Sequence, residues 1–332
     1  MNQDFRYLIE DFCRQCGMDN PNRVLDGGTL IVNQVDFSLV HNEKLNPAAV
    51  IIYGDLGEFP PGCGATPYLN LLEANMGVDG EPVYALSYDT GRGVLTDRYP
   101  LNRKSASEQL REVLVHLAAK IVEWRKARVA TGAQPGSASR GLPGLQASSL
   151  HPARSPKPIL NGAISSGAPS IRQSADSSLI AARPMDERVT QLIQAFCTLA
   201  APPDPALVVL GESVTVDGIM FWLTCKEQQG SPLLRVRCDF GELPGERLAD
   251  ACKTLLTMNW YLYNGIDPAF SICPKSARVL FEKSYSLETL TPNILHRTLT
   301  ELAAKVGEWR LVHFLEPLPA SRKYRPEWAK QQ

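Results

Sequence analysis

Apolar residues recur at helical spacing near the start of the chain and again past its middle. In both places they are spaced i, i+3, i+4 and i+7, which puts them on one face of a helix. The first set is Phe5, Leu8, Ile9 and Phe12, and the second is Val189, Leu192, Ile193 and Phe196. The pattern predicts two amphipathic helices, each packed on a hydrophobic core.

The residues after the first helix follow a definite order of patterns. Alternation of apolar and polar residues predicts strands, and a return to helical spacing predicts two further helices. A glycine-containing turn between two apolar runs predicts a hairpin. The expected elements are one or two strands in 30–41, a strand at 49–55, a helix at 66–76, a hairpin of 83–89 and 94–99, and a last helix from Ser105 with Glu108 as its capping-box partner.

The second half of the chain repeats the first almost without gaps. The segment Asp55–Pro60 reads DLGEFP, and Asp239–Pro244, 184 residues later, reads DFGELP. Further matches at this offset are Leu8 with Leu192, Phe37 with Phe221 and Asn75 with Asn259, and Glu123-Trp124-Arg125 returns one residue later as Glu308-Trp309-Arg310. A register kept over so many positions indicates one domain encoded twice. Trp124 and Trp309, retained in both copies, are expected in the two cores.

Each copy is expected to be an α+β unit of order α-β-β-β-α-β-β-α with a twisted, mostly antiparallel sheet. The predicted units are 1–129 and 185–316. Residues 130–184 are rich in Ser, Pro, Gly and Ala and contain no aromatic residue. Such a composition cannot bury enough surface to offset its ordering entropy, so we predict a disordered linker with a reach of roughly 40 Å. Residues 317–332 form a basic C-terminal tail.

The composition gives no sign of a nucleic-acid or membrane protein. The chain has 332 residues, a net charge of −1, 44% hydrophobic and 21% charged residues. A charge so near zero exerts no overall attraction on nucleic acid or an anionic membrane. No stretch approaches the roughly 18 consecutive apolar residues of a membrane span, and the first residues lack a signal-peptide pattern. These features predict a cytosolic protein.

The eight cysteines do not have the spacing of a metal site. Cys13 and Cys16 form a C-x-x-C pair, but the second copy has Cys197 followed by Ala200. Zinc sites need further Cys or His ligands, and none stands nearby. We therefore expect no metal and no cofactor, with Cys13 and Cys197 as buried apolar groups.

Candidate catalytic motifs are isolated. Asp239-Phe240-Gly241 spells a kinase motif without the glycine-rich loop, strand lysine or H-R-D loop that kinase chemistry requires. The five histidines fall at positions that do not match between the copies. The repeated carboxylates Asp55/Asp239 and Glu58/Glu242 are interpreted as helix-cap partners. An enzyme would need a one-copy site, for example a Cys63 nucleophile, and remains the alternative from another functional class.

Each copy resembles the class I type III secretion chaperones typified by the Tir chaperone, the CesT-like family. The features that carry the resemblance are the opening Leu-Ile-x-x-Phe-Cys helix, the Asp-x-Gly-Glu-x-Pro junction, the following Leu-Leu-x-x-Asn and the final Glu-Trp-Arg. They cover about 4–129 and 186–315. The resemblance implies a non-enzymatic protein of the bacterial cytoplasm, linked to virulence, that holds the N-terminal segment of a secreted effector in non-globular form. The secretion ATPase or sorting platform is a further candidate partner, and a regulatory adaptor that binds another protein is the alternative function.

The tandem arrangement suggests that the two copies pair within the chain as a pseudo-dimer. In the resembled family the second helix lies at the dimer interface, which predicts a contact between the copies through Leu72, Met76, Met258 and Trp260. Differences between the copies suggest where a partner binds. Ile51 and Tyr53 in the first copy correspond to Arg235 and Arg237 in the second, where Met220 and Trp222 add an apolar second face. Aromatic, Met and Arg side chains are typical of binding patches, so these six residues are the predicted partner-binding set.

Overall fold

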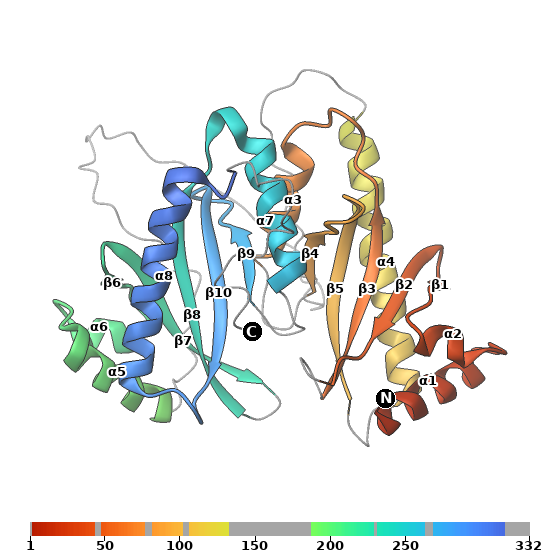
Figure 1. Cartoon of the computed structure of the whole chain (residues 1–332), viewed down its shortest axis with the longest axis horizontal. Helices are drawn as coiled ribbons and strands as arrows, with labels where there is room; N and C mark the ends of the chain where they lie inside the picture. Colours follow the sequence, from red (N-terminus) through yellow and green to blue (C-terminus); the bar gives the residue numbers. More distant parts are fainter. Residues whose placement is uncertain are drawn as a thin grey trace, which may run out of the picture.

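The computed structural model describes residues 2–43, 48–76, 82–101, 106–132, 187–228, 231–262 and 268–315. These residues form two units that lie side by side, each with one sheet and its helices (Figure 1). Of the predicted linker at 130–184, only the first three residues lie within the described part of the chain, and the predicted tail at 317–332 lies wholly outside it. The capping residue expected at Ser105 also lies outside them.

Unit 1 consists of nine elements within the described part of the chain. They are α1 (Gln3–Gln15), α2 (Pro21–Leu25), β1 (Leu30–Val32), β2 (Val35–Val40), β3 (Ala49–Gly57), α3 (Thr66–Ala74), β4 (Val83–Leu86), β5 (Gly93–Pro100) and α4 (Ser107–Gly132). The sheet has the order β1-β2-β3-β5-β4 with antiparallel neighbours.

Unit 2 repeats this order. Its elements are α5 (Glu187–Ala200), α6 (Pro205–Val209), β6 (Val214–Val216), β7 (Ile219–Gln228), β8 (Ser231–Glu242), the short 3-10 helix η2 (Gly245–Arg247), α7 (Leu248–Leu262), β9 (Ala269–Ile272), β10 (Arg278–Ser286) and α8 (Pro292–Val312). The sheet order is β6-β7-β8-β10-β9, again antiparallel. The predicted repeat of one α+β domain is therefore confirmed.

The observed elements differ from the predicted ones in three ways. The short helices α2 and α6, which begin at Pro21 and Pro205, were not predicted. The helix expected at 66–76 ends at Ala74, so Met76 lies just beyond it. In unit 2 the corresponding helix α7 is longer, at 15 residues against 9 for α3.

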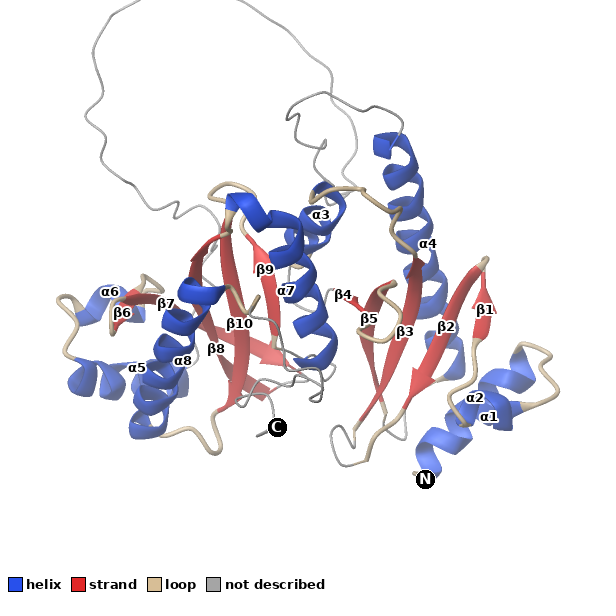
Figure 2. Cartoon of the chain, turned by 45° about the horizontal axis from the view of Figure 1, so that its top comes forward, coloured by secondary structure: helices blue, strands red, loops and turns tan. Residues whose placement is uncertain are grey.

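The first and last helices of each unit cover one face of its sheet, as Figures 1 and 2 show. The side chains between the layers are apolar, as the sequence pattern requires, and the centre of the unit 2 core is Trp309, which is fully buried. Its counterpart Trp124 is half-buried and packs edge-on against Phe59, with the ring centroids 5.7 Å apart. Both tryptophans thus belong to the cores, Trp124 at the margin.

The Asp-x-Gly-Glu motif forms a β-bulge at the end of the long central strand. The strand register shifts between Asp55 and Gly57, and Gly57 has φ 93°, a conformation that favours glycine. The Asp55 carboxylate accepts a hydrogen bond from the Gly57 amide (3.0 Å), and Asp239 accepts one from Gly241 (2.9 Å).

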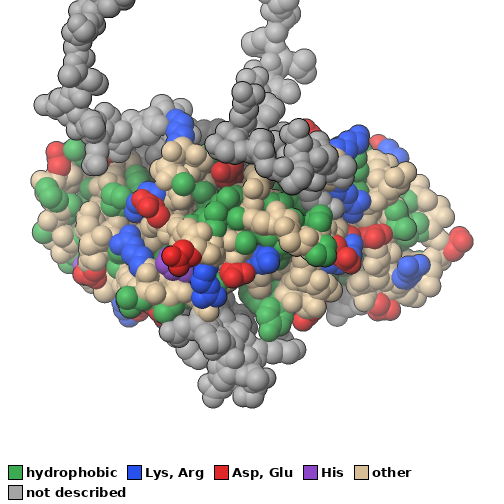
Figure 3. Space-filling view, turned by 90° about the horizontal axis from the view of Figure 1, so that it is seen from above, with side chains coloured by type: hydrophobic (Ala, Val, Ile, Leu, Met, Phe, Trp, Pro, Cys, Tyr) green, Lys and Arg blue, Asp and Glu red, His purple; other side chains and the backbone are tan. Residues whose placement is uncertain are grey.

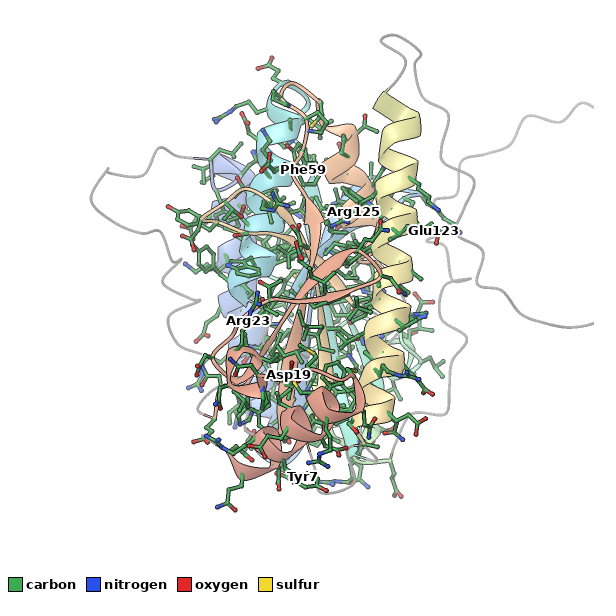
Figure 4. All side chains as sticks on the ribbon, turned by 90° about the vertical axis from the view of Figure 1, so that its right-hand side faces the viewer. Tyr7, Asp19, Arg23, Phe59, Glu123 and Arg125 are labelled. Atoms are coloured by element: carbon green, nitrogen blue, oxygen red, sulfur yellow. The ribbon has the colours of Figure 1, made fainter. Side chains whose placement is uncertain are left out.

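These carboxylates do not cap the following helix, so the helix-cap interpretation was wrong. The Arg92 guanidinium donates to both Asp55 oxygens (3.0 and 2.6 Å), and Arg278 binds Asp239 in the same way, with a closest contact of 2.7 Å. Arg125 of α4 donates to the Asp55 carbonyl (2.6 Å), and Figure 4 shows it directed toward the sheet while Glu123 points outward. The motif therefore ties the strand end to the hairpin and to the last helix.

Candidate functional site

The two units contact one another through their second helices and edge strands. Helix α7 packs against α3 and against β4 of unit 1, and α3 packs against β9 of unit 2. The two helices lie side by side in the centre of both ribbon views (Figures 1 and 2). Seen from above, hydrophobic side chains gather near the middle of the molecule, with charged groups around them (Figure 3).

An asparagine pair stands at the centre of this contact. Asn75 donates to the Tyr84 carbonyl (2.9 Å) and accepts from the Tyr84 amide (2.7 Å). Asn259 makes the same two bonds with Phe270 (2.9 and 2.6 Å). Each side-chain amide also reaches across the units, Asn75 to the Phe270 carbonyl (3.3 Å) and Asn259 to the Tyr84 carbonyl (3.4 Å).

This network has a consequence for strand addition. A bare edge strand offers unpaired amide and carbonyl groups to another chain. At β4 and β9 the asparagines occupy backbone groups of Tyr84 and Phe270, and a helix of the other unit packs on each strand. The opposite edges differ, because β6 covers only Ile219–Phe221 of the much longer β7. Among the described residues, the outer edge of β7 beyond Phe221 therefore has no paired strand, in contrast to the covered edges at β4 and β9.

Three ring contacts surround the asparagine pair. The Trp260 and Tyr53 rings are tilted by 52° with centroids 5.0 Å apart, and the Tyr261 and Tyr88 centroids lie 5.5 Å apart. The Lys253 ammonium lies 5.2 Å from the centre of the Tyr68 ring. Burial raises the pKa of the Tyr53 phenol above its usual value.

The residues predicted for the inter-unit contact lie on or directly after these helices. Leu72 and Met258 are buried, Met76 is half-buried, and Trp260 is half-buried against Tyr53. The sequence identified Asn75 and Asn259 only as matching positions in the two copies. Their identity in both copies was the signal for a shared polar role, since a buried amide requires partners.

The residues predicted for partner binding separate by unit. In unit 1, Ile51 is only 7% exposed, and Tyr53 faces Trp260 in the inter-unit contact. In unit 2, Met220 is 38% exposed and Trp222 is half-buried on β7. The structure therefore brings Tyr53 to the predicted interface residues and leaves Met220 and Trp222 on the other side of the unit 2 sheet from its core.

The outer face of the unit 2 sheet combines apolar and charged groups. Trp222 stands opposite Arg237, and Arg237 stands opposite Glu282, so the three side chains lie in one row across β7, β8 and β10. Glu282 binds Arg237 (2.7 Å) and Arg235 (3.2 Å). Both arginines are therefore paired with one carboxylate, and Arg237 lies next to Trp222 in the strand register. We call Met220, Trp222, Arg235, Arg237 and Glu282 the unit 2 face.

Among the ranges described, no three His, Cys, Asp or Glu side chains lie together as metal ligands. The Cys63 thiol contacts the Tyr68 hydroxyl at 3.7 Å. Burial raises the pKa of Cys252 to about 12, which suits a packing role rather than a nucleophile.

No helix in the described part of the chain has the length and apolar content needed to cross a membrane. The fold and the site thus define a duplicated α+β scaffold in which both sheets carry exposed apolar side chains, Met220 in unit 2 and Ile31 and Val40 in unit 1. The family model of the Tir chaperone protein (CesT) family matches residues 7–125 and 213–310. The chain belongs to this family, and it contains two tandem copies of the family's domain. A comparison with curated proteins gives no match.

The family assigns a general role. Its members are type III secretion chaperones, non-enzymatic proteins that bind secreted effectors. The match covers the sheet and last helix of each unit, and in unit 1 also most of the opening helix. The resemblance to the CesT family that was inferred from the repeated motifs is therefore confirmed, and so is the predicted fold.

Proposed function

We propose that the protein is a tandem secretion chaperone that holds the N-terminal segment of one secreted effector on the unit 2 face. The observation that carries this proposal is the exposed Met220 next to Trp222, which lies in a row with Arg237 and Glu282. Met220 and Trp222 both lie on strand β7, whose outer edge beyond Phe221 has no paired strand among the described residues. An extended segment can pair with such an edge and place alternate side chains over the adjoining face.

The chemistry of the unit 2 face indicates the kind of segment it accepts. Met and Trp side chains provide an adaptable apolar surface, and the arginines provide donors for carboxylates and backbone carbonyls. The bound segment therefore carries apolar residues with acidic or carbonyl acceptors between them. Unit 1 contributes mainly the contact that positions unit 2, since Tyr53 faces Trp260.

The test replaces unit 2 residues with those at the same positions in unit 1. Met220→Asp with Trp222→Ser removes the apolar groups, and the proposal expects loss of the protein captured by the wild type from the native bacterium. The captured protein's N-terminal segment is then made separately and titrated against both forms. Tyr7→Ser is a matched control, because Tyr7 is an exposed aromatic residue on α1 far along the chain from the unit 2 face.

Retained affinity in a folded double variant would remove the unit 2 face from the binding site. The identity of the captured protein separates the two candidate roles. A secreted protein bound through its N-terminal segment, and lost from the culture medium when the chaperone is deleted, supports the chaperone role. A protein that is not exported indicates the regulatory adaptor instead.

A further inference from the structure

Three ring contacts between the units, all between described residues, run in one direction. All three tyrosines belong to unit 1, and all three of their partners belong to α7 of unit 2. The pairs are Tyr53 with Trp260, Tyr88 with Tyr261 and Tyr68 with Lys253. We call Tyr53, Tyr68 and Tyr88 the tyrosine face of unit 1.

The repeat shows what each unit has at the equivalent positions. At the offset of 184, Tyr53 corresponds to Arg237 and Tyr68 to Cys252. Tyr84 and Phe270 make the same bonds to their asparagines and are therefore equivalent, at an offset of 186. At this offset Tyr88 corresponds to Pro274. Unit 2 therefore has no aromatic residue at any position of the tyrosine face.

The helices that meet this face differ in the same way. Trp260 of α7 corresponds to Met76 after α3, and Lys253 corresponds to Leu69. Helix α3 thus presents neither the indole nor the ammonium group that the tyrosines contact. Face and helix complement one another only when the face comes from unit 1 and the helix from unit 2.

We propose that the tyrosine face selects unit 2 as its partner, so that unlike units pair in preference to like units. In a pair of two unit 1 domains, Tyr53 would meet Met76 and Tyr68 would meet Leu69. In a pair of two unit 2 domains, Trp260 would meet Arg237, a cation that Glu282 already binds at 2.7 Å, so each side would keep one ring contact instead of three. Neither like pair rebuilds the three contacts.

The asparagine pair acts differently from the tyrosine face. Asn75 and Asn259 are the same residue at the same position, and each bonds the edge strand of its own unit and of the other. Any pairing of the two domains would keep these bonds. They set the register of the contact, while the tyrosine face determines which units make it.

The size of the preference follows from the contacts. An aromatic pair or a cation over a ring contributes roughly two- to ten-fold in affinity. The unlike pair has three such contacts and the like pairs have one on average, which predicts an excess of unlike over like pairs on the order of twenty-fold. The preference keeps the two halves together in the presence of other copies of the same fold. It does not depend on which partner the unit 2 face binds.

The experiment removes the linker's contribution, because a tether alone raises the effective concentration to about the millimolar range. A site for a specific protease is inserted within 133–186 of the full chain, and the purified protein is cleaved. The two halves are unfolded in urea, refolded together by dilution and weighed by native mass spectrometry. The expected result is the complex of unit 1 with unit 2, with like pairs at about five percent of it. Like and unlike pairs in statistical proportion would overturn the proposal.

A double-mutant cycle in the intact chain gives a second answer that needs no refolding of halves. Tyr53→Leu, Trp260→Met and their combination are compared by urea unfolding. The selective contact predicts that the double variant loses clearly less stability than the sum of the single variants. Trp222→Met is the matched control, since it makes the same change on the same unit outside the ring contacts, and it should show no coupling to Tyr53→Leu. Additive losses at Tyr53 and Trp260 would contradict a selective contact.

Discussion

Units 1 and 2 share an element order, a sheet topology and a bulge motif, yet their outer sheet faces differ. Unit 1 places Tyr53 against the other unit, and unit 2 presents Met220 and Trp222 beside two arginines. Two polar pairs kept in both copies, Asn75/Asn259 and Asp55/Asp239, hydrogen-bond to the backbone, and the other matched residues named above include core residues such as Phe37/Phe221. Duplication thus preserved the groups that the fold requires and left the surface free to change.

The difference suggests a division of roles between the units. In a symmetric pair of identical domains, every residue occurs at two equivalent places, so a change that suits one place is also made at the other. A tandem chain removes this constraint because each copy has its own sequence. Unit 1 could then gain a face for its neighbour, and unit 2 a face for a partner protein. The predictions below compare equivalent residues in the two units, which tests how far the copies have diverged.

The largest difference is expected at the two core tryptophans. Trp309 is fully buried, so Trp309→Ala should lower the free energy of unfolding of unit 2 by about 4 kcal/mol through lost packing and a cavity. Trp124 is half-buried beside Phe59, and Trp124→Ala should cost roughly half as much. Urea unfolding followed by circular dichroism measures both. Equal losses would show that the two cores are packed alike, against the burial seen here.

A smaller difference is expected at the two asparagines. Asn259 is fully buried and Asn75 is half-buried. Asn259→Ala leaves the Phe270 amide without its partner, and an unsatisfied buried group costs about 2 kcal/mol. Asn75→Ala should cost about 1 kcal/mol, because water can reach the Tyr84 amide more readily.

The asparagine variants also have a structural readout. Amide hydrogen exchange at Phe270 and Tyr84 should speed up in the variant of the same unit, since these amides lose their acceptors. Leu311→Ala is the control, because Leu311 is strongly exposed near the end of α8 and its truncation should leave both amides unchanged. Protection that stays the same in Asn259→Ala would mean that the edge strand does not depend on the side-chain bonds.

The sequence predicted the repeat, the order of the main elements and the helices at the contact, because each depends on periodicity or on matched positions. It could not predict α2 and α6, since five residues are too few to display a helical period. It also assigned Asp55 and Asp239 to helix caps. Their arginine partners are brought close by the hairpin, and the offset there is 186 rather than 184, so Arg92 and Arg278 did not align.

The candidate site was only partly accessible to sequence reasoning for a related reason. Tyr53 and Trp260 were each singled out, one for partner binding and one for the inter-unit contact. Their meeting depends on how α7 packs across β4, which no local pattern encodes. Met220 and Trp222 were found because the other copy has polar residues at those positions. Comparison between copies thus located differences, and the fold determined which of them face outward.

The smallest effect concerns the pH dependence of unit 1. Burial acts to raise the pKa of Asp55, but hydrogen bonds from Arg92 and Gly57 and the charges of Arg92 and Arg125 outweigh it, so the pKa lies below its usual value. A lowered pKa in the folded state means that the ionised carboxylate stabilises the fold above the unfolded-state pKa of about 3.9. This contribution is lost as the pH falls through the lower, folded-state pKa. Asp55→Asn should therefore reduce stability at neutral pH by about 1 kcal/mol and leave it nearly unchanged at low pH.

The control for this pH dependence is Glu58→Gln. Glu58 also binds Arg92, at 2.9 Å, but its side chain is largely exposed, and exposed ion pairs contribute little. Urea unfolding of the wild type and both variants is measured from neutral pH down to about pH 3. The difference between wild type and Asp55→Asn should shrink toward acid, while Glu58→Gln follows the wild type throughout. A gap that stays constant with pH would show that Asp55 acts through the shape of the bulge, where the Gly57 amide needs an acceptor, rather than through its charge.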